Sequence, residues 1–161
     1  QDKGITKIGN KNLLMAYTHI AHDCSVGDNN VFANNAGIAG HVSIGNHVVL
    51  GGYSAVHQFC NLGDYSFAGM NTSITMDVPA YTKVASNPAR VIGINSVGMS
   101  RNEIPPESIS LIKQAFKILY KKGLKLEDSL KQIDILKSET SDSYLEIFTE
   151  SIKSSSRGIL R

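Results

Sequence analysis

The sequence is poor in the residues that mark several protein classes: it has no tryptophan, four prolines, two cysteines and a formal net charge of +2. That charge is too small to indicate a protein that binds nucleic acid. No run of about 18 apolar residues occurs, so the sequence predicts no membrane span. No secretory signal opens the chain, and because its first residue is Gln1 rather than methionine, we interpret it as a fragment without its natural start. With 42% hydrophobic and 19% charged residues, the composition is that of a globular protein.

A six-residue period runs through the first half of the chain. Every sixth position from Ile8 is apolar, in the series Ile8, Leu14, Ile20, Val26, Phe32, Ile38, Ile44, Leu50, Val56, Leu62, Ala68 and Ile74. A helix would scatter these residues around its axis, whereas a solenoid stacks them into ladders. Such hexapeptide repeats resemble the left-handed parallel β-helix, in which three repeats form one triangular coil. Equivalent residues of neighbouring coils then stack about 4.8 Å apart. We therefore predict an all-β solenoid, whose left hand follows from the resemblance alone.

The period changes after Pro79, which divides the chain into three predicted parts. Residues 1–79 are expected to form β-helix coils, with further N-terminal coils missing, and residues 80–104 a connecting loop. Residues 105–161 predict a small α-helical C-terminal domain, because Ile109, Ile112, Phe116 and Leu119 form a helical apolar stripe. Two more helices are expected over 126–136 and 144–152.

The two cysteines, Cys24 and Cys60, occupy the same repeat position two coils apart. Two strand spacings amount to about 9–10 Å, whereas a disulfide needs Cα atoms within about 7 Å. We expect both thiols to be free and packed as small apolar residues. Free thiols suit a reducing cytoplasm, which is the predicted location.

Histidines are the feature that the repeat does not require. Four of the five fall into neighbouring columns of the predicted β-helix, while His47 falls elsewhere and stays unassigned. The register brings one patch together from His22, Asp23, Gly40, His41, His57 and Gln58, while His19 lies one corner earlier. A solvated outer face explains any single histidine, but it explains a shared patch poorly.

This patch suits acyl transfer. A neutral histidine can take a proton from an alcohol, and a carboxylate can orient it and stabilise the imidazolium. A glycine N–H, which Gly40 could supply, can bind the developing oxyanion. No serine or cysteine nucleophile is needed. The alternative is a metal site like the zinc site of γ-class carbonic anhydrases, but the paired-histidine spacing of that family is not found around His41 or His57, so no metal is predicted.

Several segments carry a more specific resemblance. They are His-Ile-Ala-His-Asp-Cys at 19–24, Ala-Asn-Asn-Ala at 33–36, Ala-Gly-His-Val at 39–42, Ala-Val-His-Gln-Phe-Cys at 55–60, Asp-Val-Pro at 77–79 and Ser-Arg-Gly-Ile-Leu-Arg at 156–161. Over essentially its whole length the chain resembles the UDP-N-acetylglucosamine O-acyltransferases, which catalyse the first step of lipid A biosynthesis.

The resemblance implies roles for the patch. His22 is then the general base with Asp23 as its partner, and Gly40 supplies the oxyanion N–H. The sugar nucleotide and thioester cleft is lined by His19, His41, His57 and Gln58. The implied reaction moves an (R)-3-hydroxyacyl group from acyl carrier protein to the 3-hydroxyl of UDP-N-acetylglucosamine, in a homotrimer with sites between subunits. No cofactor is implied, because 4′-phosphopantetheine arrives on the carrier protein.

Further positions follow from the same resemblance. Asn95 and Arg101 match residues that hold the nucleotide end, while Val97 and Asn102 depart from the family pattern there. The 3-amino variant of the acceptor also stays open. Met70 stands where many relatives carry glycine at the far end of the acyl chain. It predicts a donor near ten carbons rather than fourteen, unless the flexible methionine moves aside.

A basic stripe lies on the first predicted C-terminal helix, at Lys113, Lys117 and Lys121. It is either solvated or a docking face for the acidic carrier protein. Two other function classes remain open: a related N-acyltransferase or acetyl-CoA-dependent hexapeptide transferase, and a scaffolding β-helix without chemistry. The last would leave the stacked histidines unexplained.

Overall fold

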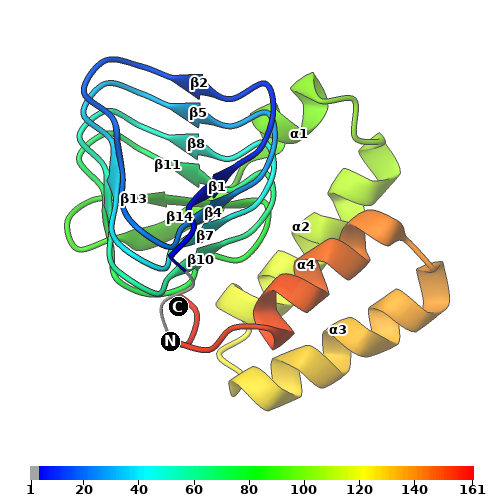
Figure 1. The fold of residues 1–161 in the computed structure, drawn as a ribbon. Coiled ribbons are helices and arrows are strands. Elements are labelled where there is room, and N and C mark those ends of the chain that lie inside the picture. Colours follow the sequence, from blue (N-terminus) through cyan, green and yellow to red (C-terminus); the bar gives the residue numbers. More distant parts are fainter. Residues whose placement is uncertain (1–3) are drawn as a thin grey trace.

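The computed structural model describes residues 4–161 and shows a parallel β-solenoid with helices packed along one side (Figure 1). Each coil contributes three short strands, one to each of three sheets. Sheet A contains β1 (Lys7–Ile8), β4 (Ser25–Val26), β7 (Ser43–Ile44) and β10 (Asn61–Leu62). Sheet B begins with β2 (Leu13–Leu14), β5 (Val31–Phe32), β8 (Val49–Leu50) and β11 (Phe67–Ala68). Sheet C contains β3 (His19–Ile20), β6 (Gly37–Ile38), β9 (Ala55–Val56) and β12 (Ser73–Ile74). The predicted solenoid is confirmed.

The coils stack in the register that the sequence predicts. Ser25 pairs with Ser43 and Val31 with Val49, so equivalent residues are 18 positions apart, since 43 − 25 = 18 and 49 − 31 = 18. The second residue of each strand points into the coil, and Phe32, Ile38 and Leu50 are at most 1% exposed. These side chains build the apolar core that holds the coils together.

A residue in the left-handed conformation closes each corner. Such residues recur every six positions, at Lys11, Tyr17, Asp23, Asn29, Asn35, His41, His47, Tyr53, Phe59, Tyr65 and Asn71. The left-handed region disfavours residues that carry a Cβ atom. The structure compensates with backbone hydrogen bonds between neighbouring coils, such as His41 N–H to the His22 carbonyl at 3.1 Å and Phe59 N–H to the Gly40 carbonyl at 3.2 Å. Side chains of one corner column therefore leave the backbone in the same direction and stack.

The segment 80–104 is not the connecting loop that the sequence predicted. It holds β13 (Thr82–Ala85), β14 (Arg90–Ile94) and α1 (Ser96–Arg101). β13 adds to sheet B parallel to β11, and β14 returns antiparallel to β13. The six-residue period ends here because the chain leaves the coil and forms a hairpin. β13 nevertheless pairs with β11 and so extends sheet B by one strand.

The C-terminal part is helical as predicted, with α2 (Pro106–Lys121), α3 (Leu126–Thr140) and α4 (Ser143–Lys153). A second core around Leu119, Ile133 and Phe148 joins these helices, and Tyr81 packs into it from the end of the β-helix. The last residues return to the β-helix, where Ile159 bridges Asp77. Among the described residues, no helix has the length and apolar character needed to cross a membrane.

Candidate active site

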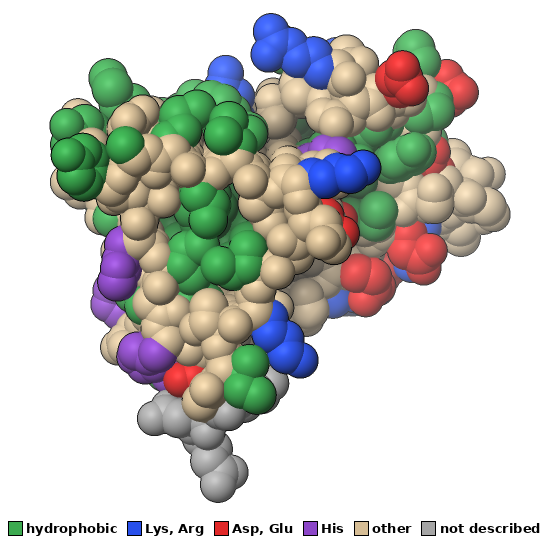
Figure 2. Space-filling view, turned by 45° about the horizontal axis from the view of Figure 1, so that its top comes forward, with side chains coloured by type: hydrophobic (Ala, Val, Ile, Leu, Met, Phe, Trp, Pro, Cys, Tyr) green, Lys and Arg blue, Asp and Glu red, His purple; other side chains and the backbone are tan. Residues whose placement is uncertain are grey.

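The predicted histidine patch lies at the corner where each coil passes from sheet C to sheet A. This histidine corner comprises residues 21–24, 39–42 and 57–60 on three successive coils. Figure 2 shows histidine side chains gathered along one edge of the β-helix. The residues lie there because the turn after β3, β6 and β9 repeats at the same place in each coil.

His22 and Asp23 form the contact that sequence reasoning left open. His22 Nδ1 lies 3.0 Å from Asp23 Oδ2, and Asp23 Oδ1 accepts a hydrogen bond from the Gly4 N–H at 2.7 Å. The Asp23 side chain is 4% exposed, whereas the His22 side chain is 69% exposed. The left-handed backbone of Asp23 (φ 59°) permits contact between adjacent residues. If His22 donates from Nδ1 to the carboxylate, its Nε2 is the nitrogen left to accept a proton.

Gly40 lies directly against the His22 ring. A Cβ atom built on Gly40 would come within 2.7 Å of both His22 Cε1 and Nε2, so only glycine permits this approach. Within the described part of the chain the Gly40 N–H makes no hydrogen bond, whereas the N–H groups of Ala39 and His41 are paired. A backbone donor thus stands unengaged beside a histidine nitrogen.

His41 occupies the next coil in the Asp23 column. Its ring meets the His22 ring edge to face, with centroids 5.1 Å apart and planes at 89°. On its other side it stacks on Phe59, with centroids 4.7 Å apart and planes at 12°. Sequence reasoning missed Phe59, although the 18-residue spacing of Asp23, His41 and Phe59 could have revealed the column.

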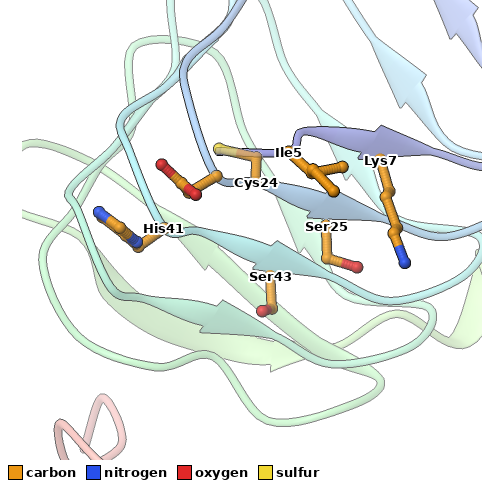
Figure 3. Close-up of a pocket in the computed structure, with 7 residues that line it drawn as sticks. Ile5, Lys7, Cys24, Ser25, His41 and Ser43 are labelled. Carbon is orange, nitrogen blue, oxygen red and sulfur yellow. The ribbon is translucent and has the colours of Figure 1, made fainter. Parts of the chain in front are cut away.

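A pocket of about 360 Å³ opens beside this corner on the outer side of sheet A. Its lining residues are Ile5, Lys7, Asp23, Cys24, Ser25, His41 and Ser43. Figure 3 shows Lys7, Ser25 and Ser43 arranged over neighbouring strands, with His41 at the corner. Asp23 and His41 therefore border a pocket that is lined mainly by polar side chains.

Cys24 is unsuited to act as a nucleophile, although it adjoins the site. It is 1% exposed, and its Sγ donates to the Ala39 carbonyl at 3.1 Å. Burial raises the pKa of the Cys24 thiol, which disfavours the reactive thiolate. Cys24 and Cys60 are both free and buried, as predicted.

The other predicted cleft residues surround this centre less closely. His19 lies exposed on the outer face of β3, and His57 and Gln58 are exposed on the coil beyond His41. His57 Nδ1 lies 3.3 Å from the Gln58 carbonyl. His47, left unassigned from the sequence, stacks on Tyr65 at another corner, with centroids 4.6 Å apart.

The predicted nucleotide-end residues lie on and beside α1. Asn95 is 8% exposed and caps this helix, because its Oδ1 accepts from the Gly98 N–H at 3.0 Å and its Nδ2 donates to the Tyr65 carbonyl at 2.9 Å. Sequence reasoning missed this capping role, which engages one N–H and one lone pair of the amide. Arg101 at the end of α1 is exposed, as is Val97.

Met70 and the lysine stripe are both accessible. Met70 is 71% exposed and lies at the corner between sheets B and C, above the Gly51–Gly52 pair of the preceding coil. A Cβ atom on Gly51 would lie 2.6 Å from Met70 N. Lys113, Lys117 and Lys121 are exposed along α2.

The histidine corner also has the chemistry of a metal site. Single ligand atoms of His22, Asp23 and His41 lie within 4.8 Å of one another. Imidazole nitrogen and carboxylate oxygen are common zinc ligands. These residues could therefore hold an ion, although the sequence predicts none.

Comparison with known proteins connects this geometry to a family. A sequence profile described as "Udp N-acetylglucosamine O-acyltransferase; Domain 2" matches residues 77–160, and one described as bacterial transferase hexapeptide repeats matches residues 5–40. A curated acyl-[acyl-carrier-protein]–UDP-N-acetylglucosamine O-acyltransferase from Alkalilimnicola ehrlichii is 43% identical over 98% of this chain and 60% of its own length. The chain belongs to the UDP-N-acetylglucosamine O-acyltransferase family.

Solved structures of this family share the fold. The UDP-N-acetylglucosamine O-acyltransferase of Moraxella catarrhalis superposes with a TM-score of 0.94 at 44% identity, over 99% of this chain and 62% of that one. The Arabidopsis UDP-N-acetylglucosamine acyltransferase gives a TM-score of 0.90 at 34% identity, over 96% and 56% of the two chains. The chain thus spans about 60% of the length of the family members that it matches.

Proposed function

We propose that the protein transfers an (R)-3-hydroxyacyl group from acyl carrier protein to the 3-hydroxyl of UDP-N-acetylglucosamine, in lipid A biosynthesis. The names of its relatives support this reaction. The observation that carries it is the His22–Asp23 contact of 3.0 Å beside the unengaged Gly40 N–H. This arrangement contains a base, its orienting carboxylate and an oxyanion donor.

In the proposed reaction, His22 Nε2 takes the proton of the sugar 3-hydroxyl as its oxygen attacks the thioester carbonyl. Asp23, which is nearly unexposed, stabilises the imidazolium that forms. The Gly40 N–H binds the oxygen of the tetrahedral intermediate. When the C–S bond breaks, the thiolate of the carrier's 4′-phosphopantetheine receives the proton from His22. The products are the ester and a free carrier thiol, and the protein needs no cofactor of its own.

Around this centre we assign His19, His41, His57 and Gln58 to the cleft for sugar nucleotide and thioester, and Asn95 and Arg101 to the nucleotide end. The lysines of α2 are assigned to the carrier protein, because their exposed positive charge suits an acidic partner. Two free, buried cysteines support a reducing compartment, so we place the reaction in the cytoplasm.

A homotrimer with sites between subunits is also part of the proposal. Large side chains are exposed along the corner between sheets B and C, where Tyr17 is 85%, Tyr53 63% and Met70 71% exposed. A partner subunit would cover such a surface. Sedimentation equilibrium of the full-length protein tests this assembly, and a monomer at micromolar concentration would refute it.

Met70 is proposed to limit the acyl chain to about ten carbons. Its side chain is 71% exposed at the corner between sheets B and C, so it can block the path of the acyl chain that the resemblance implies there. Filling a fitted apolar slot costs about 1–3 kcal/mol, and each buried methylene contributes about 0.8 kcal/mol. Competing ten- and fourteen-carbon donors against wild type and Met70→Gly test this, and no shift toward the longer chain in the variant would refute it.

The reaction is tested with full-length protein, 3-hydroxyacyl carrier protein and UDP-N-acetylglucosamine. The same assay includes the 3-amino acceptor, a UDP-3-acyl-glucosamine for the N-acyltransferase alternative, and acetyl-CoA as a donor. We expect ester formation only with the acylated carrier and unchanged rates after chelation with EDTA. Exclusive amide formation on the UDP-3-acyl-glucosamine, or complete loss of activity with EDTA, would contradict the proposal.

A further inference from the structure

The proposed reaction gives no role to Phe59, which completes the column of Asp23 and His41 at the histidine corner. Asp23, His41 and Phe59 have left-handed φ angles of 59°, 61° and 65°. Their spacing of 18 residues places them on three successive coils, and the shared backbone conformation directs their side chains alike. The ring of His41 therefore lies on Phe59, with centroids 4.7 Å apart and planes at 12°.

On the side away from Phe59, the His41 ring contacts His22. The two imidazoles meet edge to face at 5.1 Å and 89°, so the His41 ring is held between His22 on one coil and Phe59 on the other. An imidazole turns about two side-chain bonds, and stacking on a flat ring restricts both. Phe59 is 47% exposed, so packing of the β-helix core does not require a large aromatic side chain at this position.

We infer that Phe59 is a positioning residue for the acyl transfer: its ring fixes the plane of His41, so that His41 presents one nitrogen to the sugar nucleotide beside His22. This inference rests on the proposed function. The Phe59 backbone makes a separate contribution, because its N–H donates to the Gly40 carbonyl at 3.2 Å. A side-chain substitution leaves that bond available, so it tests the ring alone.

The test compares Phe59→Leu, which keeps an apolar side chain but loses the flat face, with Phe59→Tyr, which keeps it. A matched control is His47→Leu, which removes a comparable stack at another corner, where His47 lies on Tyr65 with centroids 4.6 Å apart and planes at 2°. We measure kcat and KM for both substrates, the melting temperature, and the ring proton shifts of His41 by NMR, assigned with His41→Gln.

For Phe59→Leu we expect KM for UDP-N-acetylglucosamine to rise about 2- to 12-fold, the factor that corresponds to about 0.5–1.5 kcal/mol for an aromatic pair. KM for the carrier protein should stay unchanged, and the His41 ring protons should lose their upfield ring-current shift. Phe59→Tyr should behave as wild type, and His47→Leu should leave both KM values unchanged even if it melts earlier.

Three results would overturn the inference: wild-type KM in Phe59→Leu, the same rise in KM in Phe59→Tyr, or the same rise in KM in His47→Leu. Failure of the proposed function is distinguishable, because wild-type protein would then transfer no acyl group. In that case the His41 ring shifts still report whether Phe59 orders that ring.

Discussion

The close approach of Gly40 to His22 allows one added methyl group to test the proposed catalytic geometry. In Gly40→Ala the new Cβ would lie 2.7 Å from His22 Cε1 and Nε2, whereas ordinary contacts begin at 3.4 Å. The imidazole must therefore retreat by about 0.7 Å, since 3.4 − 2.7 = 0.7. That movement disturbs the 3.0 Å contact with Asp23 or withdraws Nε2 from the alcohol.

A misplacement of about 1 Å can reduce a rate by about 10²-fold, so we expect kcat of Gly40→Ala to fall by roughly that factor. The fold should tolerate the methyl group, because Gly40 does not lie in the left-handed region. Replacing glycine by alanine in a compatible conformation also restricts the unfolded chain, which is worth about 0.4–1 kcal/mol. The free energy of unfolding should therefore change by no more than about 1 kcal/mol.

Gly37→Ala is the matched control on the same coil. Its built Cβ meets only the His19 Cβ atom, at 3.9 Å, which is an ordinary contact. Initial rates of ester formation at saturating donor and acceptor, with a thermal melt of each variant, make the comparison. A Gly40→Ala enzyme within about twofold of wild-type kcat would refute the geometric reasoning, as would an equal loss in Gly37→Ala.

Three further predictions follow from the same structure. His22→Ala should lower kcat by about 10²–10⁴-fold while the oligomer stays intact; a variant that keeps half of wild-type kcat contradicts the base assignment. Replacing Lys113, Lys117 and Lys121 of α2 by glutamate should raise KM for the carrier protein and weaken the dependence of that KM on salt. KM for the sugar nucleotide should stay unchanged. Burial raises the pKa of Cys60 from its ordinary value of 9.0 to about 11, so a thiol reagent at pH 7 should label it only after unfolding. The folded state favours this protonated thiol, so its contribution to stability is complete below pH 9 and is lost as pH rises toward 11; rapid labelling of native protein would show that Cys60 is accessible.

The second half of the chain shows which elements a local sequence pattern predicts and which it does not. The apolar stripe at 109, 112, 116 and 119 predicts a helix, and α2 (Pro106–Lys121) forms there because a surface helix must bury one face whatever lies beneath it. The segment 80–104 carries no such period, since β13 and β14 form a hairpin whose place in sheet B depends on the pairing of β13 with β11. Asn95 is likewise assigned to the nucleotide end by resemblance alone, while its capping bonds to Gly98 and Tyr65 depend on where α1 docks.

The sequence by itself determined the solenoid, its 18-residue register and the corner on which the histidines gather, because a repeated apolar position can be buried only by stacking equal coils. It also determined that Cys24 and Cys60 stay free, since their separation follows from that register. Only the tertiary structure decided which side chains touch. The His22–Asp23 contact, the close approach of Gly40 and the stack of Phe59 on His41 depend on left-handed corner residues and on ring orientations that no spacing records. A ladder places Cα atoms to within a strand spacing, whereas proton transfer depends on fractions of an ångström between side-chain atoms.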